Sequence, residues 1–129
     1  MARPTSKHPT EVELQILKAL WAAGALSGQG VRDALAPVRD VAYTSVMTTL
    51  GIMEEKGYVK RSKKDGRFQY AARVTEKATS RRMLRDMVDR VFDGSTVTAM
   101  MNLLEASDVD ADEMSQLREL IQRRSKEQS

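Results

Sequence analysis

Apolar residues recur at helical spacing in the first part of the chain. Thr10 and Glu13 form a capping-box pattern, in which the hydroxyl accepts from a free helix amide and the carboxylate accepts from the amide of the cap residue. This pattern predicts a helix that starts at Thr10 and ends at Gly24. Its apolar stripe contains Leu14, Leu17, Leu20 and Trp21. We expect Trp21 to be a core anchor rather than a functional aromatic residue.

A second, shorter helix follows the first. Ser27 can cap this helix and Pro37 stops it. Its apolar face contains Val31, Ala34 and Leu35. Gly28 and Gly30 fall in its first turn, where each glycine destabilises a helix by ~1 kcal/mol relative to alanine. We therefore predict a short, frayed element.

A third helix covers residues 43–56 and ends at Gly57. Its buried face, at positions i, i+4 and i+7, contains Val46, Leu50 and Met53. Its opposite face is small and mostly polar, with Thr44, Met47, Thr48 and Gly51. Two short helices in close succession after a first helix predict a helix-turn-helix.

The periodicity then changes to that of a β-hairpin. Val59 begins one arm, and Phe68 and Tyr70 lie two residues apart on the other arm, so the two rings share one face. Asp65-Gly66 is among the strongest two-residue signals for a hairpin turn. A helix-turn-helix followed by such a hairpin has the winged-helix design.

Helical spacing returns after Ala72. It predicts one helix over residues 75–92, a second over 96–106, and a third that Asp110 caps with Glu113 three positions on. Three short helices within about 55 residues bury little core by themselves. We therefore expect them to complete their core with a second copy of the chain. The alternative is that they pack onto the first domain of the same chain.

The predicted fold is mainly α with a small β-hairpin wing. Residues 1–73 form a winged helix-turn-helix DNA-binding domain and residues 74–129 a C-terminal helical dimerisation domain. The dimerisation residues share the apolar faces of the last helices: Leu84, Val88, Val91, Met100, Met101, Leu104, Leu117, Leu120 and Ile121. Residues 1–9 and the tail after about Arg124 are polar, and we expect them to be loose.

The composition excludes several kinds of chemistry. The 129 residues contain no cysteine, so a disulfide, a thiolate nucleophile and a Cys-ligated metal are all excluded. His8 is the single histidine, and no catalytic set, metal-ligand spacing or phosphate-binding glycine loop accompanies it. We predict no enzyme, no cofactor and no metal. No apolar run approaches the ~20 residues that span a membrane, so a cytoplasmic protein without membrane insertion is expected.

The charges separate along the chain although the net charge is only +3. Residues 56–67 contain six basic residues and one acid, whereas residues 103–119 contain six acids and one base. We interpret the acidic stretch as a solvated surface. In the basic stretch, five residues of the hairpin can neutralise DNA phosphates: Lys60, Arg61, Lys63, Lys64 and Arg67. Each such contact contributes roughly 0.9 to the slope of log K against log salt.

The start of the third helix is where a recognition helix meets base edges. The residues predicted to contact DNA there are Tyr43, Thr44, Ser45, Met47 and Thr48. Threonine offers a hydroxyl to bases or phosphates and a methyl to thymine. Because residues 43–56 contain no Arg, Asn or Gln, we expect apolar contacts, water and DNA shape to supply much of the specificity. The alternative is that this face is merely exposed.

Four ordered segments resemble one family of winged-helix proteins. The segments are TEVELQILKALWAAG, RDVAYTSVMTTL, EEKGYVKR and KKDGRFQYAA, within a resemblance that covers roughly residues 9–124. They are similar to the BlaI/MecI-type penicillinase repressors. This resemblance implies a homodimeric repressor that binds a palindromic operator of double-stranded DNA. It also implies that Thr44, Ser45, Met47 and Thr48 lie on the recognition helix and that residues 63–67 lie on the wing.

Antibiotic-responsive members of that family are cleaved in the dimerisation domain after a membrane sensor metalloprotease is activated. The matching bond here is Asn102–Leu103. The family motif has an aromatic residue after the asparagine, where this chain has Leu103. Gly51 stands where the family often has a basic residue, and the C-terminal cysteines of copper-responsive relatives are missing.

Three functional hypotheses remain open at this stage. The first is the dimeric repressor, with inactivation by cleavage. The second is a winged-helix regulator that a small-molecule ligand gates directly, although Phe92 is the one aromatic residue after Ala72 that could line a pocket. The third is a winged helix that contacts proteins and not DNA.

Overall fold

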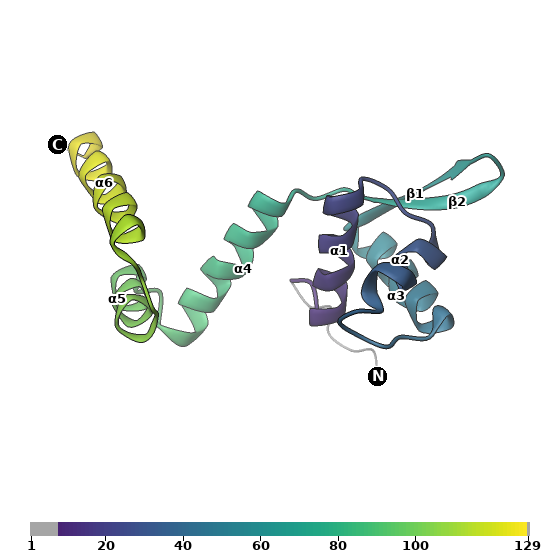
Figure 1. Ribbon diagram of the computed structural model, residues 1–129, viewed down its shortest axis with the longest axis horizontal. Helices are drawn as coiled ribbons and strands as arrows, with labels where there is room; N and C mark the ends of the chain where they lie inside the picture. The colour runs from purple at the N-terminus through teal and green to yellow at the C-terminus, as the bar shows by residue number, and fades with distance from the viewer. Residues whose placement is uncertain (1–7, 129) are drawn as a thin grey trace. The chain divides into compact units, whose positions relative to one another are not determined.

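The computed structural model describes residues 8–128 and contains, within that range, six helices and one β-hairpin (Figure 1). The elements are α1 (Glu11–Ala23), α2 (Gly28–Leu35), α3 (Tyr43–Lys56), β1 (Val59–Lys64), β2 (Arg67–Ala72), α4 (Glu76–Val91), α5 (Thr96–Ala106) and α6 (Ala111–Glu127). Every helix and strand expected from the sequence is present. The prediction of a mainly helical fold with a hairpin wing is confirmed.

The chain forms two compact units, which we describe separately. The first unit ends at Leu84 and the second begins at Arg85, so the division falls inside α4. The sequence places the boundary between residues 73 and 74, at the loop before α4. The first turns of α4 pack with the first unit, where Thr79 is buried.

Local hydrogen bonds set the beginnings of the first two helices. The Thr10 hydroxyl accepts from the Glu13 amide at 3.2 Å, and the Thr10 amide donates to Glu13 Oε1 at 2.8 Å, which completes the predicted capping box. The Ser27 hydroxyl accepts from the Gly30 amide at 3.0 Å at the start of α2. Each cap satisfies an amide that the helix itself leaves without a partner.

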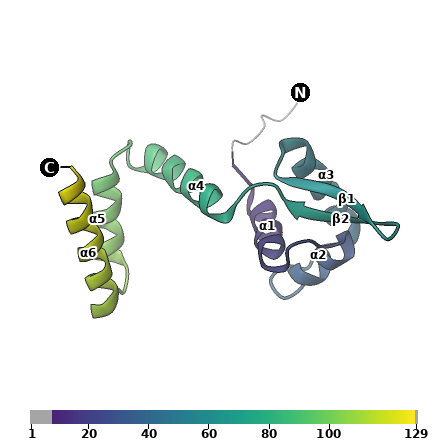
Figure 2. The same cartoon turned by 90° about the horizontal axis from the view of Figure 1, so that it is seen from above.

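One apolar core holds the first unit together. Figures 1 and 2 show α1, α2 and α3 grouped together, with the hairpin extending from them. The buried residues come from all five elements: Ile16, Leu17, Leu20, Val31, Leu35, Val46, Leu50, Met53, Val59 and Tyr70. Two details of the predicted stripes are wrong. Ile16 is buried and Leu14 only half-buried in α1, and Ala34 is exposed in α2, because the neighbouring elements cover a slightly rotated face of each helix.

Trp21 lies at the rim of this core. Its ring packs against the core cluster while remaining half-buried, and its Nε1 donates to the Val74 carbonyl at 2.9 Å. Trp21 therefore anchors the segment after β2 to α1. The prediction of a structural role is confirmed, and the indole also has the polar partner that a partly buried tryptophan requires.

The hairpin has a two-residue turn and a fixed register. Lys64 pairs with Arg67, so Asp65 and Gly66 form the turn, and both have positive φ (53° and 78°) as this type of turn requires. Tyr70 also exchanges backbone hydrogen bonds of 2.8 and 3.0 Å with Leu26. This bridge fastens the base of the wing to the loop between α1 and α2.

The second unit contains the end of α4 together with α5 and α6 (Figure 2). Asp110 and Glu113 form the predicted capping box of α6, with bonds of 2.9 and 3.3 Å. The helix α6 continues to Glu127, so the expectation of a loose tail after Arg124 is wrong for residues 125–127. Residues 1–7 of the expected loose N-terminus lie outside the described residues. Within residues 8–128, no helix is long and apolar enough to cross a membrane.

Candidate DNA-binding interface

The outer face of α3 presents short polar side chains. Thr44, Ser45 and Thr48 are all exposed. The Thr48 hydroxyl donates to the Thr44 carbonyl at 3.0 Å, and the Thr49 hydroxyl donates to the Ser45 carbonyl at 2.9 Å. With its proton engaged in this way, the Thr48 oxygen can accept a hydrogen bond, and its methyl group stays exposed. This face therefore suits amino groups and methyl groups on base edges.

Met47 and Tyr43 lie nearer to α2 than the sequence suggests. Met47 is half-buried against the core, and a Cβ atom on Gly28 would collide with its Sδ atom. The same Cβ would lie 3.4 Å from Cε2 of Tyr43, although that ring remains partly exposed. Met47 thus packs between α3 and α2 and leaves only part of its side chain exposed beside Thr44 and Thr48. Gly28, which weakens α2 locally, is the residue that allows this close approach.

Ile52 extends the exposed face of α3 by one turn. It follows Thr48 by four residues and is exposed, as is Gly51 beside it. Sequence reasoning missed Ile52 because an isoleucine in a helix is usually assigned to the core. Its i+4 spacing from Thr48 was the signal that could have identified it.

The wing presents five exposed cations on its two faces. Because successive strand residues point to opposite sides, Arg61 and Lys63 share one face, and Lys60, Lys64 and Arg67 share the other. Arg61 also forms an ion pair of 3.8 Å with Glu54 at the end of α3. The predicted cations are therefore close together in space but point in two directions.

A buried ion pair connects α1 to the end of α3. Lys56 Nζ lies 3.0 and 3.1 Å from the two carboxylate oxygens of Glu13. The side chains are only 3% exposed for Glu13 and 15% exposed for Lys56. Lys56 Nζ also lies 5.7 Å from the centre of the Tyr58 ring. These contacts fix the last turn of α3, and hence the direction of its exposed face, relative to α1.

Apolar side chains are largely exposed in the second unit. Of the residues predicted for dimerisation, those exposed are Leu84, Val91, Met100, Met101, Leu104, Leu120 and Ile121. Leu84 is the last residue of the first unit and the others belong to the second. Val88 is buried and Leu117 half-buried. Between α5 and α6 a groove of about 320 Å³ is lined by Met100, Leu120 and Ile121, with Thr96, Arg124, Ser125 and Gln128.

Comparison with known proteins identifies the family. The model of the penicillinase repressor family matches residues 9–123. The chain belongs to the penicillinase repressor family. The resemblance noted in the sequence is thereby confirmed. Because this is a family of transcriptional repressors, the chain is a transcriptional regulator.

Individual relatives of this family member are distant but span most of the chain. The methicillin resistance regulatory protein MecI of Mammaliicoccus sciuri is 21% identical over 115 residues, which is 89% of this chain and 94% of MecI. MecI of Staphylococcus aureus strain N315 is 20% identical with the same coverage. An uncharacterized 16.5 kDa protein of Latilactobacillus sakei is 26% identical over 91% of this chain and 82% of its own length. Among solved structures, a MarR family transcriptional regulator from Silicibacter pomeroyi DSS is similar with a TM-score of 0.46 and 16% identity, covering 92% of this chain and 71% of that one.

The Asn102–Leu103 bond, which the sequence resemblance relates to a cleavage site, lies inside α5. Asn102 is exposed, and its Nδ2 donates to the Thr98 carbonyl at 2.9 Å, one turn earlier. Leu103 is 55% exposed. A protease requires an extended segment, so cleavage at this bond requires α5 to unwind locally.

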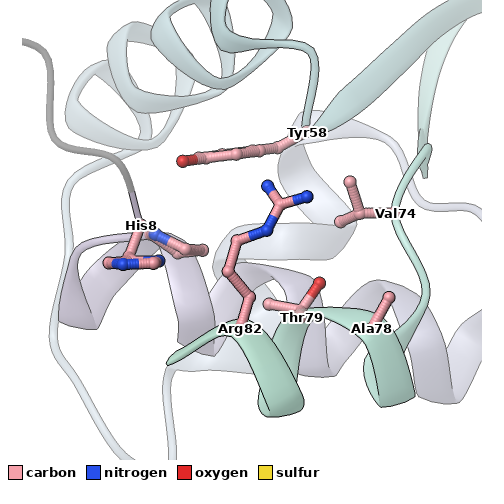
Figure 3. Close-up of a pocket in the computed structure, with 7 residues that line it drawn as sticks. His8, Tyr58, Val74, Ala78, Thr79 and Arg82 are labelled. Atoms are coloured by element: carbon pink, nitrogen blue, oxygen red, sulfur yellow. The ribbon is translucent and has the colours of Figure 1, made fainter. Parts of the chain in front are cut away.

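A small pocket in this penicillinase repressor family member is lined by the first turns of α4, by Tyr58 and Val74, and by residues 8–9. Figure 3 shows Arg82 and Thr79 of α4 beneath the Tyr58 ring, with His8 on one side and Val74 on the other. The pocket holds about 50 Å³, whereas pockets for drug-sized ligands usually hold roughly 300–1,000 Å³. No group of three or more acidic or histidine side chains among residues 8–128 is arranged to bind a metal ion.

Proposed function

We propose that this protein represses transcription by binding a palindromic operator as a homodimer. The observation that carries the proposal is the exposed Thr44, Ser45 and Thr48 face of α3 beside a cationic wing, in a member of a repressor family. In each subunit α3 enters the major groove and the wing lies on the neighbouring backbone. The two half-sites follow the twofold symmetry of the dimer.

The helix α3 and the wing make different kinds of contact with DNA. Thr48 and Thr44 read base edges through an accepting oxygen and through methyl contacts with thymine. The five wing cations release counterions from phosphates, which gives a salt slope of roughly 4.5 per subunit if all five are engaged. Because α3 carries no bidentate reader of purines, DNA shape and bridging water supply the remaining specificity.

The second unit supplies the dimer interface in this proposal. Its exposed apolar residues and the α5–α6 groove are unusual for a monomer, which rarely exposes contiguous apolar surface of this kind. A second copy would cover them, as the family resemblance implies. Joining two DNA-binding units raises affinity by roughly 10²- to 10⁴-fold through effective concentration.

A mobility-shift assay tests the repressor proposal. The full-length protein is titrated against its own promoter region and against random DNA at several salt concentrations. We expect the promoter to bind more tightly, and equal affinity for both DNAs would refute sequence recognition. Thr48→Ala should reduce the preference for the promoter, whereas Lys64→Ala should weaken binding to all sequences and lower the salt slope by about 0.9 per subunit.

Sedimentation of the full-length protein tests the dimer. Leu120→Asp places a charge on the exposed apolar face and should yield monomers at micromolar concentration. Gln122→Asp, an exposed change on the same helix, is the matched control and should remain dimeric. A wild-type protein that sediments as a monomer would contradict the assembly.

We further propose that cleavage at Asn102–Leu103 releases repression. Cutting α5 there separates Met100 and Met101 from Leu104, so both parts of the apolar face lose their partners and the dimer loosens. A membrane sensor metalloprotease is the activator that the family resemblance implies. Intact-mass measurement of the protein recovered from β-lactam-treated cells should show a fragment that ends at Asn102. Recovery of uncut protein while its target genes are induced would exclude this mechanism.

Direct gating by a small molecule is the weaker candidate. The pocket below Tyr58 is too small for a typical effector, and the α5–α6 groove is open and lies on the face assigned to the dimer. A thermal-shift screen of small molecules separates the two hypotheses. A ligand that raises the melting temperature and releases DNA without cleavage would favour direct gating.

A further inference from the structure

One aromatic side chain of the wing has no role in the core. Phe68 is 47% exposed, whereas its neighbour on the same strand face, Tyr70, is 4% exposed and belongs to the core. Phe68 pairs with Lys63 across the hairpin, two positions beyond the last core contact of β2. Exposing half of a phenylalanine on a two-stranded wing costs hydrophobic stabilisation, and the ring has no place in the apolar core.

Two of the wing cations lie close to the ring. The guanidinium carbon of Arg61 is 4.5 Å from the centre of the Phe68 ring, and Nζ of Lys63 is 5.5 Å from it. Both distances are within the range of cation–π attraction. Arg61 is also paired with Glu54 of α3 at 3.8 Å. The ring thus holds two like charges side by side on the wing face that adjoins the recognition helix.

This arrangement combines the two chemistries of a DNA backbone. Phosphates attract the cations, whereas the deoxyribose between two phosphates presents an apolar surface of C–H groups. Gln69 and Ser62, the cross-strand pair next to Phe68, point to the opposite face and offer no apolar group of this size. An apolar ring flanked by cations at this spacing matches a sugar flanked by phosphates.

We propose that Phe68 is a DNA-contacting residue of the wing. Its ring lies against a deoxyribose of the backbone that borders the groove occupied by α3, while Arg61 and Lys63 bind the phosphates on either side. The proposal rests on the repressor function proposed above. It adds an apolar contact that carries no sequence information and no salt dependence to a wing otherwise expected to act by charge alone.

Hydroxyl-radical footprinting tests this contact because the radical cleaves at the deoxyribose. The full-length protein is bound to a duplex of its promoter region, and wild type is compared with Phe68→Ala, Phe68→Leu and Gln69→Ala. Phe68→Ala should bind roughly tenfold more weakly with a nearly unchanged salt slope, and sugars beneath the wing should lose protection. Phe68→Leu should retain part of the affinity and protection, and Gln69→Ala should match wild type.

Two results would overturn the proposal. One is unchanged affinity and protection in Phe68→Ala. The other is weaker binding with the sugar protection intact, since Phe68 would then act only by positioning Arg61 and Lys63. If Phe68→Ala melts below wild type, Phe68→Leu supplies the same comparison in a folded protein. Failure of the repressor function is distinguishable, because wild type itself would then show no preference for the promoter.

Discussion

Removing the carboxylate of Glu13 should destabilise the first unit strongly. In Glu13→Ala, the Thr10 amide loses its acceptor at 2.8 Å and Lys56 loses both oxygens of its counterion. Breaking a buried ion pair by removing one partner costs about 3–5 kcal/mol, because the remaining charge stays desolvated. Lys56 is 15% exposed and can extend toward water, so we expect the lower end of this range, about 3 kcal/mol.

Urea unfolding followed by tryptophan fluorescence measures this loss of stability in the first unit of the chain. Trp21 is the single tryptophan of the chain and lies at the rim of the core of the first unit, so its signal reports that unit. With an m-value of about 1.5 kcal/mol/M, a loss of 3 kcal/mol lowers the midpoint by about 2 M. Protein concentration must be held constant, because the proposed dimerisation would contribute to apparent stability.

Two comparisons isolate the ion pair. Glu11 also forms an ion pair, at 3.8 Å with Arg39, but its side chain is 80% exposed, so Glu11→Ala should cost less than about 0.5 kcal/mol. Lys56→Met in the Glu13→Ala background removes the orphaned charge and should recover part of the lost stability. The reasoning is refuted if Glu13→Ala unfolds within about 0.5 kcal/mol of wild type, which would mean that the pair contributes no more than a surface contact.

The remaining predictions concern glycines and caps. Gly51→Ala should raise the free energy of unfolding by about 0.5–1 kcal/mol in urea titrations, since Gly51 lies inside α3 with open space at its Cβ position. The same change at Gly57 should lower it by about 1 kcal/mol, because Gly57 ends α3 with a φ of 83°; equal signs for the two variants would contradict this explanation. Ser27→Ala should cost about 1 kcal/mol through the lost cap of α2, and loss of helical circular dichroism on heating should show a lower melting temperature.

Short-range interactions made most of the helices and strands predictable from the sequence. The caps at Thr10, Ser27 and Asp110 act over three residues, and the Asp65-Gly66 turn acts over two, so a linear pattern contains the whole interaction. Apolar spacing likewise gave the core face of each helix approximately. Its errors, at Ile16 and Ala34, arise because the neighbouring elements and not the helix itself decide which side is covered.

Only the tertiary structure decided how these elements form an interface. Glu13 and Lys56 are 43 positions apart, and Trp21 and Val74 are 53 apart, so no local pattern reveals that they bind each other. The close approach of Gly28 and Met47 likewise half-buries a side chain that the sequence places on the outer face of α3. The hairpin register placed Phe68 beside Arg61 and Lys63, outside the core that contains Tyr70. The sequence by itself therefore determined the order of elements, through local hydrogen bonds and periodicity, and its motifs indicated the family. Long-range packing decided which side chains remain exposed on α3 and the wing.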